Sequence, residues 1–258
     1  MKVVSLILGA LASVGFAQQA TLCKDYEYFS SNGYQLNNNI WGRSFATSGS
    51  QCTYVDSVSA TGAKWHTKWT WAGGKDNVKS YVYSGRQITK KKVNQYTNLE
   101  TEAYWVYDTT NQRSNVAYDL FTAADINHDT SSGDYELMVW LARYDVWPIG
   151  TSQGMVTVAG RSWELFYGPN GSMKVYSFVP PVGQPIYNFK ADLKEFFAYL
   201  TNNKGYPASS QNLISKFLNA TTMTMRMLTS IVAYQFGTEA FTGGPATFTV
   251  NQWSANAW

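Results

Sequence analysis

Apolar and polar residues alternate along much of this chain, and the alternation is clearest over residues 134–144. Successive side chains of a β-strand point to opposite faces, so this stretch would have two different faces. One face is purely aliphatic and suits a packed core, while the other combines a carboxylate, a thioether and an indole. The aliphatic face comprises Leu137, Val139 and Leu141, and the mixed face comprises Glu136, Met138, Trp140 and Ala142.

The mixed face has two interpretations when this stretch is considered alone. Its composition suits a surface that binds a sugar, because the apolar side of a sugar ring stacks on aromatics while its hydroxyls need polar partners. Alternatively, the strand is half exposed and Glu136 points into solvent.

The same period of two predicts further strands. Residues 64–71 place Trp65, Thr67, Trp69 and Trp71 on one face, which is either packed or lined for a ligand. Additional strands are expected over residues 78–83, 103–107 and 115–121, and a hairpin over residues 162–167 and 173–179.

A helical repeat is clear only in residues 190–203. Leu193, Phe196, Phe197 and Leu200 lie at helical spacing and would form one apolar face. A glycine and a proline follow closely and are expected to end the helix. The sequence therefore predicts a strand-rich protein with one helix.

The N-terminus has a short basic start, an apolar run from Val3 to Phe16, and small residues near Ala17. This pattern is typical of a secretory signal peptide, residues 1–17, and we expect cleavage after Ala17. The run is too short to span a membrane, and no later segment approaches ~20 apolar residues. Residues 18–258 contain no linker or repeat, so we expect one secreted domain.

Aromatic residues make up 16% of the chain and charged residues 14%, which suits a β protein with a carbohydrate cleft. The net charge of +3 is too small to indicate a nucleic-acid or anionic-membrane partner. The two histidines, His66 and His128, are too few for a His-containing metal site or a Ser-His-Asp arrangement. We expect a monomer without metal or cofactor.

The two cysteines, Cys23 and Cys52, are predicted to form a disulfide, as an even pair in a secreted chain usually does. Closing a loop of this length contributes roughly 3–4 kcal/mol in the chain-entropy model. Two free thiols or a redox pair are the alternatives. Asn170 and Asn219 begin sequons for N-linked glycans.

Residues 125–136 approximate an EF-hand calcium loop, with acids or amides at positions one, three and five and Glu136 at position twelve. We reject this interpretation for two reasons. Position six is Thr130, where the turn requires glycine, and no amphipathic helix flanks the stretch. A polar connection leading into a strand explains the residues better.

Two motifs together carry a family resemblance. Glu136 lies in Tyr-Glu-Leu-Met-Val-Trp, and Glu239 lies in Gly-Thr-Glu-Ala-Phe. The pair resembles glycoside hydrolase family 12, whose nucleophile and acid/base occupy such motifs, and the likeness extends over nearly the whole mature chain. Details are most similar to fungal endoglucanases, although many relatives have proline where this chain has Ala240.

The resemblance implies roles for residues at matching positions. Glu136 would be the nucleophile, Glu239 the acid/base, and Asp119 a third carboxylate beside the nucleophile. Without the resemblance, Asp119 would be assigned to a turn or strand edge. The implied substrate-binding residues are Asn39 and Trp41, from an Asn-x-Leu-Trp-Gly-like motif, with Met138, Trp140, Phe241 and, where relatives often have tryptophan, Tyr26. The resemblance implies that Trp41 stacks on a glucosyl unit on the non-reducing side of the scissile bond.

The resemblance also implies a β-jelly-roll of two curved antiparallel sheets with one packed α-helix, and a disulfide between Cys23 and Cys52. The implied activity is a secreted, retaining endo-β-1,4-glucanase acting on cellulose or β-glucan. A xyloglucan-specific enzyme is the alternative. A non-catalytic, glucan-binding jelly-roll is a second alternative, but it would not need paired carboxylates.

One stretch departs from the family pattern. Residues 215–232 separate Ile214 from Ala233, although the two flanking segments would form an uninterrupted strand if joined. We interpret these 18 residues as a retained intron in the gene model, since an insertion inside a central strand would cost ladder hydrogen bonds. A genuine insertion, forming a loop or short helix beside the acid/base strand, is the alternative.

Overall fold

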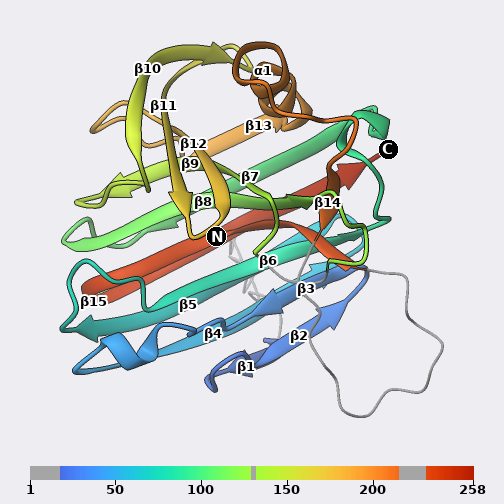
Figure 1. Ribbon diagram of the computed structural model, residues 1–258. Helices are drawn as coiled ribbons and strands as arrows, with labels where there is room; N and C mark the ends of the chain where they lie inside the picture. The colour runs from blue at the N-terminus through green and yellow to red at the C-terminus, as the bar shows by residue number, and fades with distance from the viewer. Residues whose placement is uncertain (1–17, 129–131, 215–230) are drawn as a thin grey trace, which may run out of the picture.

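The computed structural model describes residues 18–128, 132–214 and 231–258. The predicted signal peptide and residues 215–230 of the suspected insertion therefore lie outside the described residues. Fifteen strands and one α-helix form the described fold (Figure 1), whose bounds run as follows. They are β1 (Ala20–Leu22), β2 (Tyr28–Ser31), β3 (Tyr34–Asn37), β4 (Ser48–Ser59), β5 (Gly62–Ala72), β6 (Ser80–Ile88), β7 (Leu99–Tyr107), β8 (Gln112–Ala123), β9 (Tyr135–Tyr144), β10 (Thr151–Val158), β11 (Arg161–Asn170), β12 (Met173–Val179), β13 (Asn188–Asp192), α1 (Lys194–Lys204), β14 (Asn212–Ile214) and β15 (Ile231–Ala257).

The strands pair into two layers that share β15, which runs through the middle of the molecule in Figure 1. One layer has the order β2-β3-β6-β15-β8-β9-β12-β11-β10, and uses the first part of β15. The other has the order β1-β4-β5-β15-β7-β13, and uses the last part of β15. The predicted jelly-roll with one helix is confirmed, although β12 pairs with β9 in parallel and not in the antiparallel way expected.

Strand β15 changes layers near Gly243, which pairs with both Trp71 on β5 and Gln112 on β8. Gly243 and Gly244 have φ angles of +110° and +90°, a region that residues with a Cβ rarely adopt. The glycines that follow the Glu239 motif therefore let one long strand serve both sheets.

The core between the layers is dominated by aromatic side chains. On β5, Trp65, Thr67, Trp69 and Trp71 are all buried, whereas Lys64 and Lys68 on the opposite face are exposed. The predicted alternation is therefore confirmed. Of the two uses left open for this face, packing is the one observed, because its tryptophans belong to the main core.

Strand β9 also alternates as predicted, with one exception. Leu137, Val139 and Leu141 pack in the main core, and Met138 and Trp140 pack in a second cluster on the opposite face. Ala142, expected on the face of Glu136, packs in the main core instead. The register with β8 shifts after Trp140, since Trp140 pairs with Ala117 and Ala142 with Val116, and such a bulge reverses the alternation.

The predicted helix starts too early. Residues 190–192 belong to β13, which pairs with β7, and α1 begins at Lys194. Asp192 sets this boundary, because its Oδ1 accepts hydrogen bonds from the backbone N–H groups of Lys194 (2.9 Å) and Leu99 (2.7 Å). The four apolar residues expected on one face are buried, and Gly205 ends the helix in the left-handed conformation.

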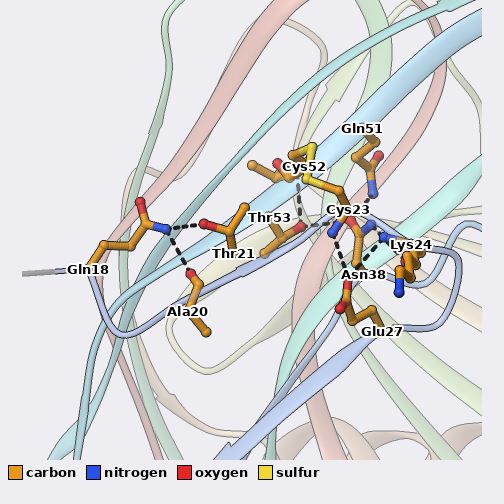
Figure 2. The surroundings of a disulfide bond; sticks show 11 residues. Gln18, Ala20, Thr21, Cys23, Lys24, Glu27, Asn38, Gln51, Cys52 and Thr53 are labelled. Atoms are coloured by element: carbon orange, nitrogen blue, oxygen red, sulfur yellow. Dashed lines mark hydrogen bonds between the residues drawn. A yellow bond between two sulfur atoms is a disulfide. The ribbon is translucent and has the colours of Figure 1, made fainter.

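The predicted disulfide between Cys23 and Cys52 is confirmed and links the chain after β1 to β4 (Figure 2). Beside it, the side-chain oxygen of Asn38 accepts hydrogen bonds from Gln51 (3.0 Å) and Thr53 (2.9 Å) of β4. The disulfide and these bonds fix the segment that leads from β3 into Asn39 and Trp41. Among the described residues, no helix has the length and apolar character needed to cross a bilayer.

Candidate active site

A cleft of about 680 Å³ lies over the layer that contains β6, β15, β8 and β9. Eight of the nine residues predicted to act on or bind substrate line it: Asn39, Trp41, Asp119, Glu136, Met138, Trp140, Glu239 and Phe241. Tyr26, the ninth, is not among the lining residues and is 41% exposed at a positive φ of 61°. Its contact with substrate stays a prediction.

Glu136 lies near the start of β9, a strand hydrogen-bonded on both sides by β8 and β12. Its register partners are Phe121 on β8 and Val175 on β12. The side chain is only 7% exposed although it lines the cleft. A central strand with two neighbours thus holds this carboxyl group in a dry, fixed position, as a reacting group requires.

Asp119 lies on β8 and is 6% exposed. A hydrogen bond joins its carboxyl group to that of Glu136. Burial, together with the nearby charges of Glu136 and Glu239, raises the pKa of Asp119 well above its usual range. Asp119 is therefore the member of the pair that holds a proton and donates it to the hydrogen bond.

The pKa of Glu136 responds to three influences. Burial and the charge of Glu239 raise it to about 8, whereas the hydrogen bond from Asp119 opposes this rise. Three buried carboxyl groups in one cleft cannot all be ionised at low cost. Glu136 is the best candidate for the anion, because a protonated Asp119 donates to it.

Glu239 lies on β15, opposite Tyr81 of β6, and is partly exposed. Asn115 on β8 contacts it twice. The Asn115 side-chain oxygen accepts the Glu239 backbone N–H (2.9 Å), and the Asn115 side-chain N–H donates to Glu239 Oε2. Burial raises the pKa of Glu239 to about 7, and the bond from Asn115 opposes this rise. Glu239 can therefore hold a proton at weakly acidic pH.

Two tyrosines form part of the cleft floor. Tyr81 and Tyr83 stack with ring centroids 5.5 Å apart, and the Tyr81 hydroxyl donates to the carbonyl of Ala117 (3.2 Å). Burial raises the pKa of both phenols. Both phenols therefore stay neutral.

Several buried polar atoms at the cleft have no hydrogen-bond partner among the described residues. They are Asn39 Oδ1, Asp119 Oδ1 and Trp140 Nε1. Buried polar atoms are normally paired, so unpaired ones that line a cleft indicate a polar ligand. Trp41, 47% exposed, adds an aromatic surface to the same cleft. Stacking surfaces beside unpaired donors and acceptors are suited to a sugar.

Sequence reasoning missed several residues that line the cleft, and also Asn115, which lies outside the lining but contacts Glu239. Asn115 and Tyr81 were not singled out, because a lone asparagine or tyrosine in a strand carries no motif. Trp147, an exposed residue of the segment between β9 and β10, was also missed. Asn170, noted only as a sequon, lines the cleft as well. Only the strand register places them beside the predicted residues.

Residues 129–131 of the rejected calcium loop lie outside the described residues. In residues 18–128, 132–214 and 231–258, no three His, Cys, Asp or Glu side chains are grouped closely enough to hold a metal ion. Glu136 and Asp119 are hydrogen-bonded to each other, and Glu239 is hydrogen-bonded to Asn115.

Comparisons with known proteins agree with this geometry. The model of glycosyl hydrolase family 12 matches residues 32–257. Endoglucanase A of Aspergillus kawachii is 48% identical over 257 residues, with 98% of each chain covered. Xyloglucan-specific endo-beta-1,4-glucanase A of Emericella nidulans is 38% identical over 261 residues, with 99% of each covered. The crystal structure of the Humicola grisea Cel12A catalytic domain with a thio cellotetraose has a TM-score of 0.84 and 49% identity, covering 93% of this chain and 99% of that one. The chain therefore belongs to glycosyl hydrolase family 12.

Proposed function

We propose that this glycoside hydrolase is a retaining endo-β-1,4-glucanase that cuts internal bonds of cellulose or β-glucan. The observation that carries the proposal is the pair Glu136 and Glu239, presented by two strands to one cleft and coupled through their charges. A retaining enzyme needs two carboxyl groups ~5–5.5 Å apart, one as nucleophile and one as acid/base. Their different surroundings assign the roles.

In the first step, the Glu136 carboxylate attacks the anomeric carbon and forms a glycosyl ester. The bond from that carbon to the departing sugar oxygen breaks, and this oxygen takes the proton of Glu239. In the second step, Glu239, now an anion, takes a proton from water. The water oxygen bonds to the anomeric carbon, and Glu136 is released as a carboxylate. Asp119 stabilises Glu136 through their hydrogen bond whenever Glu136 carries charge.

The substrate assignment rests on the cleft and on the named relatives. Trp41, Asn39 and Trp140 supply stacking surfaces and unpaired polar atoms for glucosyl units. Endoglucanase A is the more similar of the two relatives described above. The xyloglucan-specific relative makes xyloglucan the second candidate. We further propose that the enzyme is secreted, since residues 1–17 follow a signal-peptide pattern. We also propose that it acts as a monomer.

Proton NMR of the first product tests the mechanism. Hydrolysis of a β-linkage with retention releases the β-anomer first, and the α-anomer accumulates only by slow mutarotation. An initial α-anomer would overturn the nucleophile role of Glu136. Initial rates on barley β-glucan, carboxymethylcellulose and xyloglucan decide between the two substrate classes. Release of reducing ends from none of the three would refute the endoglucanase assignment.

A further inference from the structure

We propose that Trp147 stacks on a glucosyl unit on the leaving-group side of the scissile bond, and that Arg143 positions its ring. This inference rests on the proposed function and adds a specificity residue to it. Trp147 lines the cleft and is 62% exposed, although its neighbours Val146 and Pro148 are both buried. A single exposed apolar side chain means little by itself, so the support beneath the ring carries the argument.

The guanidinium of Arg143 lies over the Trp147 ring, 4.3 Å from its centroid. Its Nη2 forms an ion pair with Glu164 Oε2 (3.1 Å), and the Arg143 side chain is only 5% exposed. Nε and Nη1 are buried and find no acceptor among the described residues. A buried cation with one ion pair gains from the π face of an indole, particularly where water is excluded. The cation therefore holds one face of Trp147 and leaves the other for a ligand.

The segment that carries Trp147 is tied down on both sides. Before it, Arg113 Nε donates to the backbone oxygen (2.9 Å) and to Oδ2 (3.0 Å) of Asp145. After it, Gly150 packs so closely on β11 that an added Cβ would lie 2.0 Å from the carbonyl oxygen of Tyr167. A ring fixed before the ligand arrives loses little entropy on binding, which favours a recognition role over an incidental exposure.

Strand order places Trp147 across the cleft from Trp41. The Trp41 segment bonds to the β6 side through the Gly42 N–H and the Lys79 carbonyl (2.9 Å), whereas Trp147 contacts Phe166 of β11. Between β3 and β11 the order is β6, β15, β8, β9 and β12, and neighbouring strands are ~4.8 Å apart. The strands of Glu239 (β15) and Glu136 (β9) therefore lie between the two tryptophans in this order. The family resemblance implies that Trp41 stacks on the non-reducing side of the scissile bond. A glucan that stacks there and crosses both carboxyl groups therefore reaches Trp147 with its departing part.

Trp147→Ala tests the stacking contact with two substrates, of which only one has sugar units on the leaving-group side. β-Cellobiosyl fluoride has no sugar on the leaving side, so its kcat/KM should stay at the wild-type value. Cellopentaose does extend there, and its kcat/KM should fall about three- to tenfold, the worth of one aromatic stacking contact. Trp258→Ala removes another exposed tryptophan, 56% exposed and outside the cleft lining, and should leave both values unchanged.

Product analysis locates the contact on the leaving side. At high cellotetraose concentration, a sugar hydroxyl can attack the anomeric carbon of the glycosyl ester in place of water, giving its proton to Glu239 and releasing Glu136. This acceptor occupies the side vacated by the leaving group. Trp147→Ala should therefore reduce the share of cellohexaose and longer products, measured by mass spectrometry, relative to hydrolysis products. An unchanged share would place the contact elsewhere and overturn the proposal.

Arg143→Met tests the positioning role. It should reproduce the Trp147→Ala loss on cellopentaose, spare β-cellobiosyl fluoride, and cause no additional loss in the double variant. Arg143→Lys keeps the cation and should restore part of the activity. A purely structural Arg143 would instead lower turnover of both substrates and add to the Trp147→Ala effect. If wild-type and Trp147→Ala enzymes cleave cellopentaose equally, the inference is wrong while the endoglucanase assignment stands.

Discussion

The two catalytic candidates are carboxyl groups of the same residue type, but the strands that carry them support them differently. Glu136 lies on β9 between β8 and β12, in a part of both ladders without a register shift, and its carboxyl partner is another acid, Asp119. Glu239 lies on β15, which has several register shifts and changes layers, and its partner is an amide, Asn115.

This difference shows how one fold can make two equivalent groups perform opposite tasks. A protonated Asp119 donates to Glu136 and so favours the anion that a nucleophile needs. Asn115 also donates to Glu239, but a neutral amide offsets burial only in part, so the pKa of Glu239 remains near 7. The neighbour on β8, not the residue type, distinguishes the two carboxyl groups, because burial raises the pKa of both, that of Glu136 to about 8.

The largest expected effect comes from removing either carboxylate. Glu239→Gln should lower kcat on cello-oligosaccharides about 10²–10⁴-fold, the usual worth of general acid–base catalysis. Glu136→Gln should lose several orders of magnitude, because no covalent intermediate can form. Both variants should still bind oligosaccharide in calorimetry, since the amides are isosteric. Near-normal turnover by either variant would contradict its assignment.

The leaving group separates the two roles. On 2,4-dinitrophenyl β-cellobioside the departing oxygen needs no proton, so Glu239→Gln should still release dinitrophenol in a burst, whereas Glu136→Gln should not. Azide should rescue Glu239→Ala with a β-glycosyl azide and Glu136→Ala with an α-glycosyl azide, identified by NMR. The reverse pattern of azides would exchange the two roles.

Asp119 should have the next largest effect. Asp119→Ala removes a hydrogen bond to a charged group, worth ~1.5–3 kcal/mol, so kcat should fall about 10- to 100-fold. Without this donor the pKa of Glu136 rises. Because Glu136 must be ionised, the acidic limb of the pH profile of kcat/KM should move to higher pH. Asp119→Asn keeps a donor N–H and should show a smaller shift, and an unmoved acidic limb in both variants would contradict this role.

Asn115 should affect the opposite limb. The wild-type kcat/KM should decline as pH rises past about 7, where Glu239 loses its proton. Asn115→Ala removes the N–H that stabilises the Glu239 anion, so the pKa of Glu239 rises and the basic limb should move to higher pH. Ser114→Ala, at the neighbouring buried position of β8, is the matched control and should leave this limb in place. A basic limb that moves to lower pH would exclude this role for Asn115.

The comparison of the two strands also shows how much of the fold could be predicted from the sequence. Alternation alone separated the core face of β9 from the cleft face, because a strand with two neighbours keeps its period. It failed at Ala142, where a bulge that leaves no mark in the sequence reverses the faces. The helix boundary was missed because Asp192, a capping-type residue, lies inside an apparent helical repeat.

The residues that distinguish the two carboxyl groups were found only in part. Asp119 was identified by resemblance to a family motif, whereas Asn115, four positions earlier on β8, was not. Its contact with Glu239 depends on how β15 pairs with β8, and that pairing joins positions remote in sequence. Trp147 shows the same limit, since its support by Arg143 and Glu164 depends on the packing of β9 against the β11 side of the sheet.

The smallest expected effect concerns the chain that leads into Glu239. Strands β14 and β15 both pair with β8, Ile214 opposite Phe121 and Gln235 opposite Asp119. Phe121 and Asp119 are thus two residues apart on β8, whereas their partners Ile214 and Gln235 are 21 residues apart in the chain. Removing residues 215–232 would leave Ile214 and Gln235 three residues apart, against two on β8, which a one-residue bulge accommodates. β15 already shifts its register with β6 by one residue between Val232 and Tyr234.

β14 and β15 therefore follow one another along the same edge of β8, as two parts of one strand would. This is expected if residues 215–232 are a retained intron. Residues 231 and 232 are the first of β15, and joining Ile214 to Ala233 would put β14 residues in their place. A variant lacking residues 215–232 should keep wild-type kcat/KM on cellopentaose and an equal or higher melting temperature, because a continuous strand still delivers Glu239 to Asn115. Its matched control, deletion of residues 211–214, removes β14 itself and should abolish activity.

Transcript sequencing, or a tryptic peptide of the native enzyme that joins Ile214 to Ala233, would support the intron. Recovery of the peptide Phe217–Arg226 from active secreted enzyme would show instead that the segment is part of the mature protein.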